Sequence, residues 1–404
     1  MNLNMKNFTS YNIHFYTDIL FGKGTENDTG RMILKHGGTK VLLIYGGGSI
    51  KATGLYDRIA ESLEKNNIPF VEMGGVQPNP RRSLAEKGIR LAADEKADFI
   101  LAAGGGSAID TAKTVALAIA NNGEYWKFYN GVEPEKMAPL GAIPTIAASG
   151  SETSRSSVIK DDTETGRKMS LNWDSCRPVF AIMNPELTYT VPARQTGAGA
   201  ADIFAHTISR YFFKDCPVSH IGDEFCEGLM RTVIRYAPPV AAEPAGYEAR
   251  AELMMASFLS HSDLMGMGRS GPRGGEHALE SQISAHYDTV HGEGLAVIMP
   301  AWLKYIADKG SAEQLERVAR FGAQVFGVKA DTQDPRKTAL EGIEAFRSWL
   351  KSMGQPLTFK ELGIPKDDLE KIVKRCIAHN NGTVPGFMEL DEKAVREIFS
   401  SVIE

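Results

Sequence analysis

Residues 98–113 read DFILAAGGGSAIDTAK. The apolar run Asp98–Ala103 has the length of a buried strand, three glycines and Ser107 follow it, and Ala108–Asn121 then carries apolar residues at helical spacing. A strand, a glycine turn and a helix in this order form the first part of a parallel β-α unit. The stretch therefore predicts an α/β domain built on a parallel sheet.

The same alternation continues on both sides of this stretch. The further expected strands are Lys40–Tyr45, Pro69–Met73 and Leu140–Thr145, with helices at Tyr56–Asn66 and Arg82–Lys96. From about Val191 onward the strand signal nearly vanishes. Helical spacing there marks Gly199–Phe213, Asp223–Tyr236, Gly246–Leu264, Ala312–Phe326 and Lys337–Met353. We expect an α/β nucleotide-binding domain at residues 1–190 and an all-helical metal-binding domain at residues 191–404.

Composition narrows the classes of function. A chain of 404 residues is too long for one ordinary core, and a net charge of −5 gives no reason to expect nucleic acid or an anionic membrane as partner. The chain lacks a membrane-length apolar run, and residues 1–24 show no basic region leading into an apolar stretch, so neither a span nor a secretory signal is expected. Cys176, Cys216, Cys226 and Cys376 lie far apart without a CxxC pair, which favours a reducing compartment. A cytoplasmic enzyme is the expectation.

Two glycine loops, each directly after an expected strand, form the candidate nucleotide site. Glycine lets the backbone approach a ligand, and the following helix offers unpaired N–H groups to a phosphate. Neither loop reads GxGxxG, and a plain tight turn stays open as the alternative. A third small-residue loop at 145–152 adds hydroxyls after the next strand. The loop residues are Gly46, Gly47, Gly48 and Ser49; Gly104, Gly105, Gly106 and Ser107; and Thr145, Ser149 and Ser151.

Histidines and one aspartate in the second half form a candidate metal site. Asp202 and His206 are spaced i, i+4, so on a helix they project from one face, and His277 and His291 follow downstream. Three imidazoles and a carboxylate suit one divalent ion, Fe²⁺ or Zn²⁺. An exposed carboxylate–imidazole pair or packed histidines would give the same spacing. His261 is a weaker candidate for the site.

An ordered series of motifs resembles the iron-containing (group III) alcohol dehydrogenases, in particular the branch of butanol dehydrogenases and NADPH-dependent aldehyde reductases. The resemblance covers nearly the whole chain. Its motifs are ILFGKG (19–24), YGGGSIKATG (45–54), GVQPNP (75–80), AGGGSAIDTAK (103–113), SGSE (149–152), NPELTYTVP (184–192), DIFAH (202–206) and the spacing of His277 and His291.

The resemblance implies an N-terminal α/β domain, a C-terminal helical domain, and hydride transfer between NADP(H) and a primary alcohol or aldehyde such as butanol or butanal. It makes Asp202, His206, His277 and His291 the metal ligands. It also implies a homodimer or a higher homo-oligomer. Beyond the glycine loops, it places Asn79, Asp110, Thr145, Ser151, Ser154, Lys168 and Leu187 along the cofactor.

Three positions depart from the family pattern. Ser281 stands where the family has a histidine near the substrate, Asn184 stands where it has an aspartate, and His286 replaces an apolar or aromatic residue. On a continuous helix His286 lies roughly opposite His277, so we expect Ser281 and His286 to line the substrate pocket rather than bind metal.

Gly47 bears on the choice of nucleotide. In NADH-preferring relatives an aspartate often occupies this position, where it accepts hydrogen bonds from the ribose and repels a 2′-phosphate. Glycine here, with Ser49 and Lys51 close behind, predicts that NADP(H) is preferred over NAD(H). Two alternatives remain: a glycerol-dehydrogenase-like or dehydroquinate-synthase-like enzyme of the same fold, and a non-catalytic sensor that Ser281 alone supports.

Overall fold

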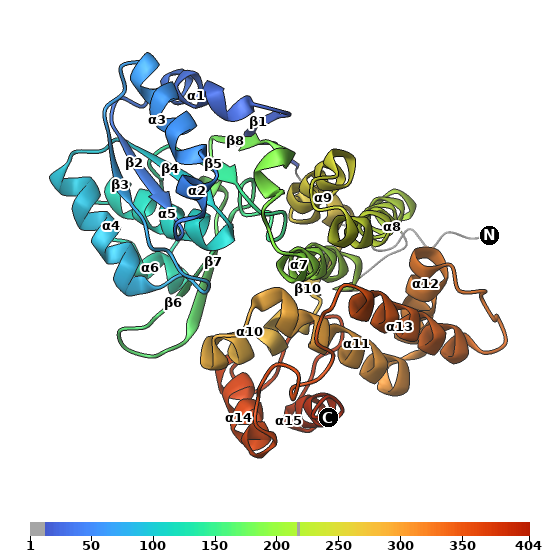
Figure 1. Cartoon of the computed structure of the whole chain (residues 1–404). Helices are drawn as coiled ribbons and strands as arrows, with labels where there is room; N and C mark the ends of the chain where they lie inside the picture. The colour runs from blue at the N-terminus through green and yellow to red at the C-terminus, as the bar shows by residue number, and fades with distance from the viewer. Residues whose placement is uncertain (1–12, 216–218) are drawn as a thin grey trace. The chain divides into compact units, whose positions relative to one another are not determined.

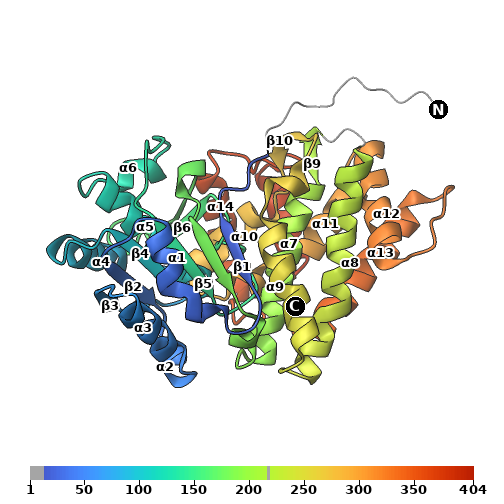
Figure 2. The same ribbon diagram turned by 90° about the horizontal axis from the view of Figure 1, so that it is seen from above.

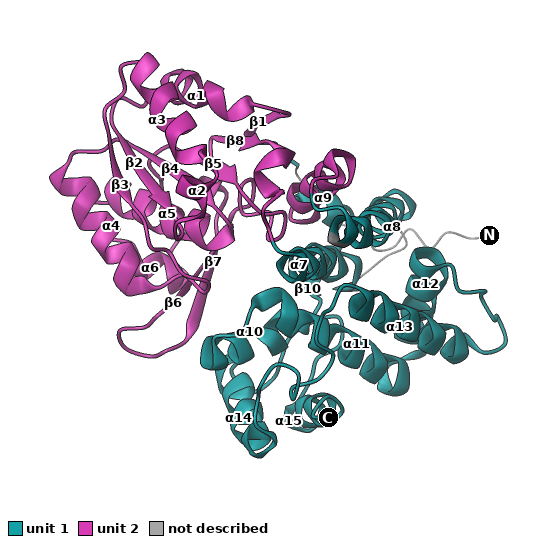
Figure 3. Cartoon of the chain, in the orientation of Figure 1, with its two compact units in different colours: residues 1–13, 192–244, 262–404 teal, residues 14–191, 245–261 magenta. Residues whose placement is uncertain are grey.

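The computed structural model describes residues 13–215 and 219–404. Cys216 and the first twelve residues, on which the expectation about a secretory signal partly rests, lie outside this description. Two compact units make up the chain (Figure 3), which we name the sheet unit, His14–Val191 with Ala245–His261, and the helical unit, Pro192–Pro244 with Ser262–Glu404. The expected fold class, a parallel-sheet α/β part and a helical part, is confirmed. However, residues 245–261 lie within the expected helical domain of 191–404 and cluster with the sheet unit.

The centre of the sheet unit is a six-stranded parallel sheet (Figure 1), with strand order β1-β8-β5-β4-β2-β3. In that order the strands are Asp18–Phe21, Phe180–Met183, Leu140–Pro144, Phe99–Gly104, Val41–Tyr45 and Phe70–Met73. The helices are α1 (Thr29–Lys35), α2 (Ser49–Ala52), α3 (Leu55–Lys65), α4 (Arg82–Asp94), α5 (Gly106–Ala120), α6 (Trp126–Tyr129) and α9 (Tyr247–Ser260). A hairpin of β6 (Ser156–Lys160) and β7 (Lys168–Asn172) is separate from the main sheet.

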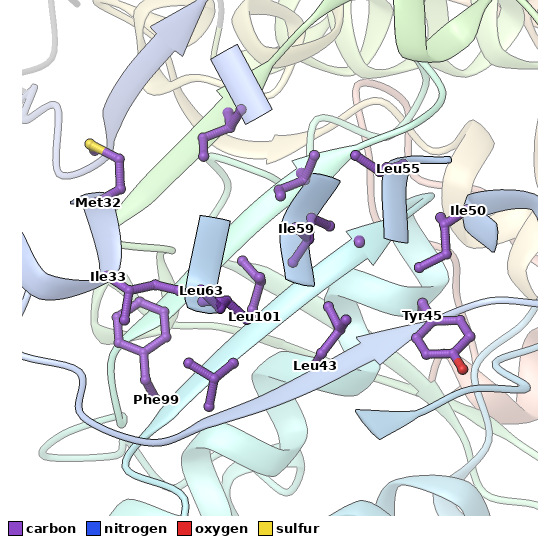
Figure 4. Close-up of a cluster of buried hydrophobic side chains, with 14 of the residues drawn as sticks. Met32, Ile33, Leu43, Tyr45, Ile50, Leu55, Ile59, Leu63, Phe99 and Leu101 are labelled. Carbon is purple, nitrogen blue, oxygen red and sulfur yellow. The ribbon is translucent and has the colours of Figure 1, made fainter. Parts of the chain in front are cut away.

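Successive side chains of a strand point to opposite faces of the sheet, so the central strands contribute to a hydrophobic core on each face. On one face, Leu43 of β2 and Leu101 of β4 pack with Ile59 and Leu63 of α3 (Figure 4). On the other face, Ile44 packs with residues of α4 and α5. Burial on both faces explains why the strands read as continuous apolar runs and why a parallel sheet was predictable.

The helical unit is built around α7 (Ala193–Tyr211), which packs against α8 (His220–Ala242) and α11 (His291–Lys309) (Figure 2). Phe204 of α7 stacks on Phe346 of α13 with ring centroids 4.8 Å apart. The other elements are α10 (Glu276–Tyr287), α12 (Ala312–Phe326), α13 (Pro335–Ser352), α14 (Leu369–His379), α15 (Glu392–Ser400), and a short hairpin of β9 (Phe213–Asp215) and β10 (Ser270–Arg273). In the described residues, no helix has the length and apolar character needed to cross a membrane.

Candidate metal and nucleotide sites

Three helices of the helical unit bring the predicted metal ligands together. Asp202 and His206 lie one turn apart on α7, His277 is the second residue of α10, and His291 is the first residue of α11. Ligand atoms of Asp202, His277 and His291 all lie within 4.8 Å of one another. His277 and His291 lie in the first turns of their helices, where side chains point toward the space before the helix and can reach a common site.

His206 lies beside these three residues. Its Nε2 atom is 3.3 Å from Oδ1 of Asp202, and its ring stacks on that of His277 with centroids 4.7 Å apart. Nε2 of His291 is 3.9 Å from the same Asp202 oxygen. All four residues predicted from the sequence thus form one cluster, in which Asp202 is buried and the three imidazoles are partly exposed.

Two buried glutamates orient the histidine rings. Nδ1 of His277 is 2.9 Å from Oε1 of Glu276, and Nδ1 of His291 contacts Oε2 of Glu280. A carboxylate on Nδ1 holds the proton there and leaves Nε2 as the ligand atom. Nε2 of His277 is buried and has no hydrogen-bond partner within the described residues, which is the arrangement that a metal would complete.

The charges at the cluster also fit a cation. Asp202, Glu276 and Glu280 are buried together, with at most 6% of each residue exposed. Buried carboxylates are costly unless a positive charge compensates them. A divalent ion held by imidazole nitrogens and the Asp202 carboxylate would supply that charge, and this donor set suits iron or zinc.

Ser281 and His286 lie on the same helix, α10, but outside the ligand cluster. The Ser281 hydroxyl donates to the carbonyl of Ala278 in its own helix, at 3.2 Å. The His286 ring meets the ring of Tyr287 edge-on, with centroids 4.7 Å apart. Their expected place in the substrate pocket stays a prediction.

The predicted nucleotide residues all lie in the sheet unit, and several gather where strands end. The first glycine loop leads into α2, with Gly47, Gly48 and Ser49 exposed. The second loop leads into α5, whose N-terminus carries no side-chain cap, so its first N–H groups suit a phosphate. The N–H of Thr145 donates to the carbonyl of Gly104 at 3.1 Å and thereby joins the ends of β5 and β4.

Gly106 brings the second and third loops into close contact. A Cβ atom at this position would lie against Oγ of Ser149, so a side chain here would require the Ser149 side chain to move. The third loop then runs through Ser151 and Ser154, whose hydroxyls are bonded within the protein. Ser151 donates to Oδ1 of Asp110 at 2.6 Å.

The remaining predicted cofactor residues occupy different parts of the sheet unit. Asn79 is buried in a left-handed backbone conformation (φ 57°), which asparagine tolerates better than most residues. Lys168 begins β7, and Leu187 packs into the core cluster beside α1 and α3. Asn184, the family departure, donates to the buried carboxylate of Glu26 at 2.9 Å, a bond that aspartate could not make when ionised.

Four further residues belong to these sites although the sequence did not single them out for these roles. Glu276 and Glu280 could have been noticed as acidic residues one turn apart beside His277. Lys113 is fully buried on α5. His261, expected only as a weak metal candidate, lies in the sheet unit, where Nδ1 is 2.8 Å from the Ser149 carbonyl oxygen. No local sequence pattern distinguishes Lys113 or His261 from a lysine or histidine that is exposed to solvent.

Comparison with known proteins agrees with this architecture. A family model described as iron-containing alcohol dehydrogenase matches residues 17–185, and one described as the C-terminal part of the Fe-containing alcohol dehydrogenase family matches residues 196–403. The chain is 37% identical to NADH-dependent butanol dehydrogenase A of Clostridium acetobutylicum, over 96% of this chain and 98% of that protein.

Two more similarities extend the comparison. The NADPH-dependent aldehyde reductase YqhD of Escherichia coli is 32% identical, over 92% of this chain and 93% of the relative. The crystal structure of NADH-dependent butanol dehydrogenase A from Thermotoga maritima superimposes with a TM-score of 0.92 at 35% identity, covering 98% of this chain and all of the other.

Proposed function

The chain belongs to the iron-containing alcohol dehydrogenase family, and from this premise we propose that it reduces aldehydes to primary alcohols with NADPH. The observation that carries the proposal is the cluster of Asp202, His277 and His291, with His206 beside it, in which buried glutamates orient the rings of His277 and His291. The overall reaction consumes one aldehyde, one NADPH and one proton, and yields one alcohol and one NADP⁺. Butanal is our first choice of substrate because two of the relatives named above are butanol dehydrogenases.

Each set of residues has a separate task. When bound, a divalent cation supplies Lewis acidity toward a carbonyl oxygen, and a reduced nicotinamide supplies the hydride. Asp202 and the three histidines hold the cation, while Glu276 and Glu280 keep Nδ1 of His277 and His291 occupied. The glycine loops and the N-terminus of α5 bind the nucleotide phosphates.

We propose NADPH over NADH because of the first glycine loop. A Cβ atom at Gly47 would have no described heavy atom within 4 Å, so a 2′-phosphate has room there. Lys51 follows on α2, half-exposed, with Nζ 3.0 Å from Oε1 of Glu72. When the 2′-phosphate binds, the ammonium group of Lys51 would leave Glu72 and pair with the phosphate instead. The named relatives include both NADH-dependent and NADPH-dependent enzymes, so the loop and not the family supports this choice.

An assay of aldehyde-dependent NADPH oxidation tests the function. We expect His277→Ala and Asp202→Ala to lose metal and turnover while they still bind nucleotide. His379→Ala, which removes an imidazole at the end of α14 outside the cluster, serves as the matched control and should behave like the wild type. Full metal content and normal rate in either cluster variant would refute the ligand assignment. Absence of net NADPH consumption with every aldehyde would favour the lyase-like or sensor alternatives.

We also propose a cytoplasmic homodimer or higher homo-oligomer. The described cysteines Cys176, Cys226 and Cys376 are buried free thiols, which suits a reducing compartment. Strand β1 lies at the edge of the sheet and exposes Ile19 and Phe21, a surface of the kind that a second copy could cover. Light scattering at working concentration measures the assembly, and a monomer would refute this part.

A further inference from the structure

The loop at residues 145–156, which we name the serine loop, is held from two sides in the sheet unit. It carries Thr145, Ser149, Ser151 and Ser154, all predicted to lie along the nucleotide. Helix α5 contacts it with side chains two turns beyond the second glycine loop, and α9 contacts it from another part of the sequence. The sequence places these residues along the nucleotide, and in the structure the hydroxyls of Ser151 and Ser154 also bond within the protein.

The contact from α5 centres on Lys113, whose side chain is fully buried. Its ammonium group donates to Oγ of Ser151 at 3.0 Å, to the carbonyl of Ser154 at 2.9 Å and to the carbonyl of Ser156 at 2.7 Å. One helical turn earlier, Asp110 accepts the Ser151 hydroxyl through Oδ1 and, through Oδ2, the N–H of Val158 at 3.0 Å. Lysine and aspartate together therefore bond the second half of the serine loop and the start of β6.

The contact from α9 involves Ser257 and His261, the residue that directly follows the helix. Oγ of Ser257 accepts the N–H of Ala148 at 3.1 Å, and the two ring nitrogens of His261 lie 2.8 Å from the Ser149 carbonyl oxygen and 3.1 Å from Oγ of Ser156. Gly150 adopts a φ of +64°, and a Cβ atom there would lie 2.6 Å from the Ser257 carbonyl oxygen. The helix therefore packs directly on the loop backbone.

Burying an ammonium group is unfavourable unless hydrogen bonds and a nearby negative charge compensate the lost hydration. Burial lowers the pKa of Lys113 to about 8, while the charge of Asp110 acts in the opposite direction. The other charged or titratable groups that face it are Glu152, Cys176 and Arg177. At neutral pH the ammonium form therefore persists and donates its hydrogen bonds.

We propose that Lys113 is a positioning residue for the nucleotide, because it locks the serine loop onto the helix whose N-terminus forms the second glycine loop. The second glycine loop and the serine loop, both predicted to lie along the nucleotide, then move as one body, and Ser149, next to Gly106, is held at a fixed place. The proposal rests on the nucleotide site of the proposed function. Lys113 itself is too deeply buried to touch the nucleotide.

The test compares Lys113→Met with Thr111→Val, measuring the dissociation constant of NADPH by fluorescence, along with metal content and steady-state kinetics. Thr111 is also fully buried on α5, but its hydroxyl bonds the carbonyl of Ser107 within the helix and not the serine loop. We expect Lys113→Met to raise the dissociation constant about tenfold or more, equivalent to about 1.4 kcal/mol. The Michaelis constant for aldehyde and the metal content should stay near wild type, and Thr111→Val should bind NADPH normally.

Hydrogen exchange provides a second readout. Residues 145–156 should exchange faster in Lys113→Met, with no change in the helical unit. If Lys113→Met does not fold, Lys113→Gln, which keeps a polar end but removes the charge, carries the same expectations. Unchanged NADPH binding in the folded variant, or an equal loss in Thr111→Val, would overturn the positioning role alone. A wild-type protein that binds neither nucleotide would overturn the proposed function as well.

Discussion

Among single residues, Glu280 is the one that holds the ring of His291. Its buried carboxylate contacts Nδ1 of that ring. We predict that Glu280→Gln weakens metal binding by roughly 10- to 100-fold, because the neutral amide orients the imidazole less firmly and lowers its basicity. Metal titration of the stripped protein measures the effect. Glu227→Gln is the control, since Glu227 is an equally buried carboxylate that bonds Tyr211 and Arg320 instead of a histidine. Equal metal affinity in both variants would contradict the role of Glu280.

Gly47 carries the prediction about nucleotide preference. A Cβ atom at this position meets no described heavy atom within 4 Å, so an aspartate has room, and in the proposed binding mode its negative charge would lie beside the 2′-phosphate. We expect Gly47→Asp to shift kcat/KM toward NADH by on the order of 1–3 kcal/mol, a tenfold to hundredfold change. Gly47→Asn occupies the same space without the charge and should shift the preference much less. A wild-type enzyme that favours NADH would contradict the argument from this loop.

The departure at Asn184 has a physical reason in this chain. Its amide donates to Oε2 of Glu26, whose other oxygen pairs with Arg58 at 2.8 Å. Asn184→Asp would place a second carboxylate against a buried one, and we expect it to destabilise the protein by about 1–3 kcal/mol at neutral pH. The midpoint of thermal unfolding should fall at pH 7 and recover partly at low pH, where one carboxyl is protonated. An unchanged midpoint at pH 7 would show that the bond to Glu26 is dispensable.

At the scale of elements, the sequence predicted the strands β2, β3, β4 and β5. The runs at 40–45, 69–73, 98–103 and 140–145 became these strands within one or two residues. Strands β1 and β8 were not predicted: β1 lies at the sheet edge with alternate exposure, and β8 is fully buried but has only four residues. The place of α9 in the sheet unit depends on its contacts with residues distant in sequence, which local periodicity does not encode.

The candidate metal site was more predictable than the network around it. The i, i+4 pair on α7 and the two later histidines are visible in the sequence, because helix geometry places Asp202 and His206 on one face. The sequence does not show which polar side chains the fold buries. Lys113 and Glu280 look like ordinary helix residues until the fold removes water from them.

The serine loop also yields a prediction about pH. Burial raises the pKa of Glu152 to about 7 from 4.5, although the nearby Lys113 charge acts against this rise. The folded protein therefore binds the proton more tightly, so this group's stabilising contribution is complete below pH 4.5 and is lost as the pH rises through 7. Glutamine does not ionise. We expect Glu152→Gln to gain stability relative to the wild type between pH 5 and pH 8, by up to about 3 kcal/mol.

Thermal midpoints of both proteins at the two pH values test the titration of Glu152. The difference between variant and wild type should be more favourable to the variant at pH 8 than at pH 5. A difference that is independent of pH would mean that Glu152 does not titrate in this range.

At the scale of the whole molecule, the two ligand sets belong to different units. The predicted metal ligands lie in the helical unit and the predicted nucleotide residues in the sheet unit. Each set is built from contacts within its own unit, so removing the metal should leave the nucleotide site folded. We therefore expect the metal-stripped protein to bind NADPH with nearly unchanged affinity, although it no longer turns over.

The central claim is that an aldehyde is reduced by NADPH only when the cluster of Asp202, His206, His277 and His291 holds a divalent metal. The most direct measurement is butanal-dependent NADPH oxidation by chelator-stripped protein of verified metal content, before and after Fe²⁺ or Zn²⁺ is restored separately. The account predicts that stripping abolishes the activity and that at least one of the two ions restores it in the wild type but not in His277→Ala. Full activity of the metal-free protein would contradict the account.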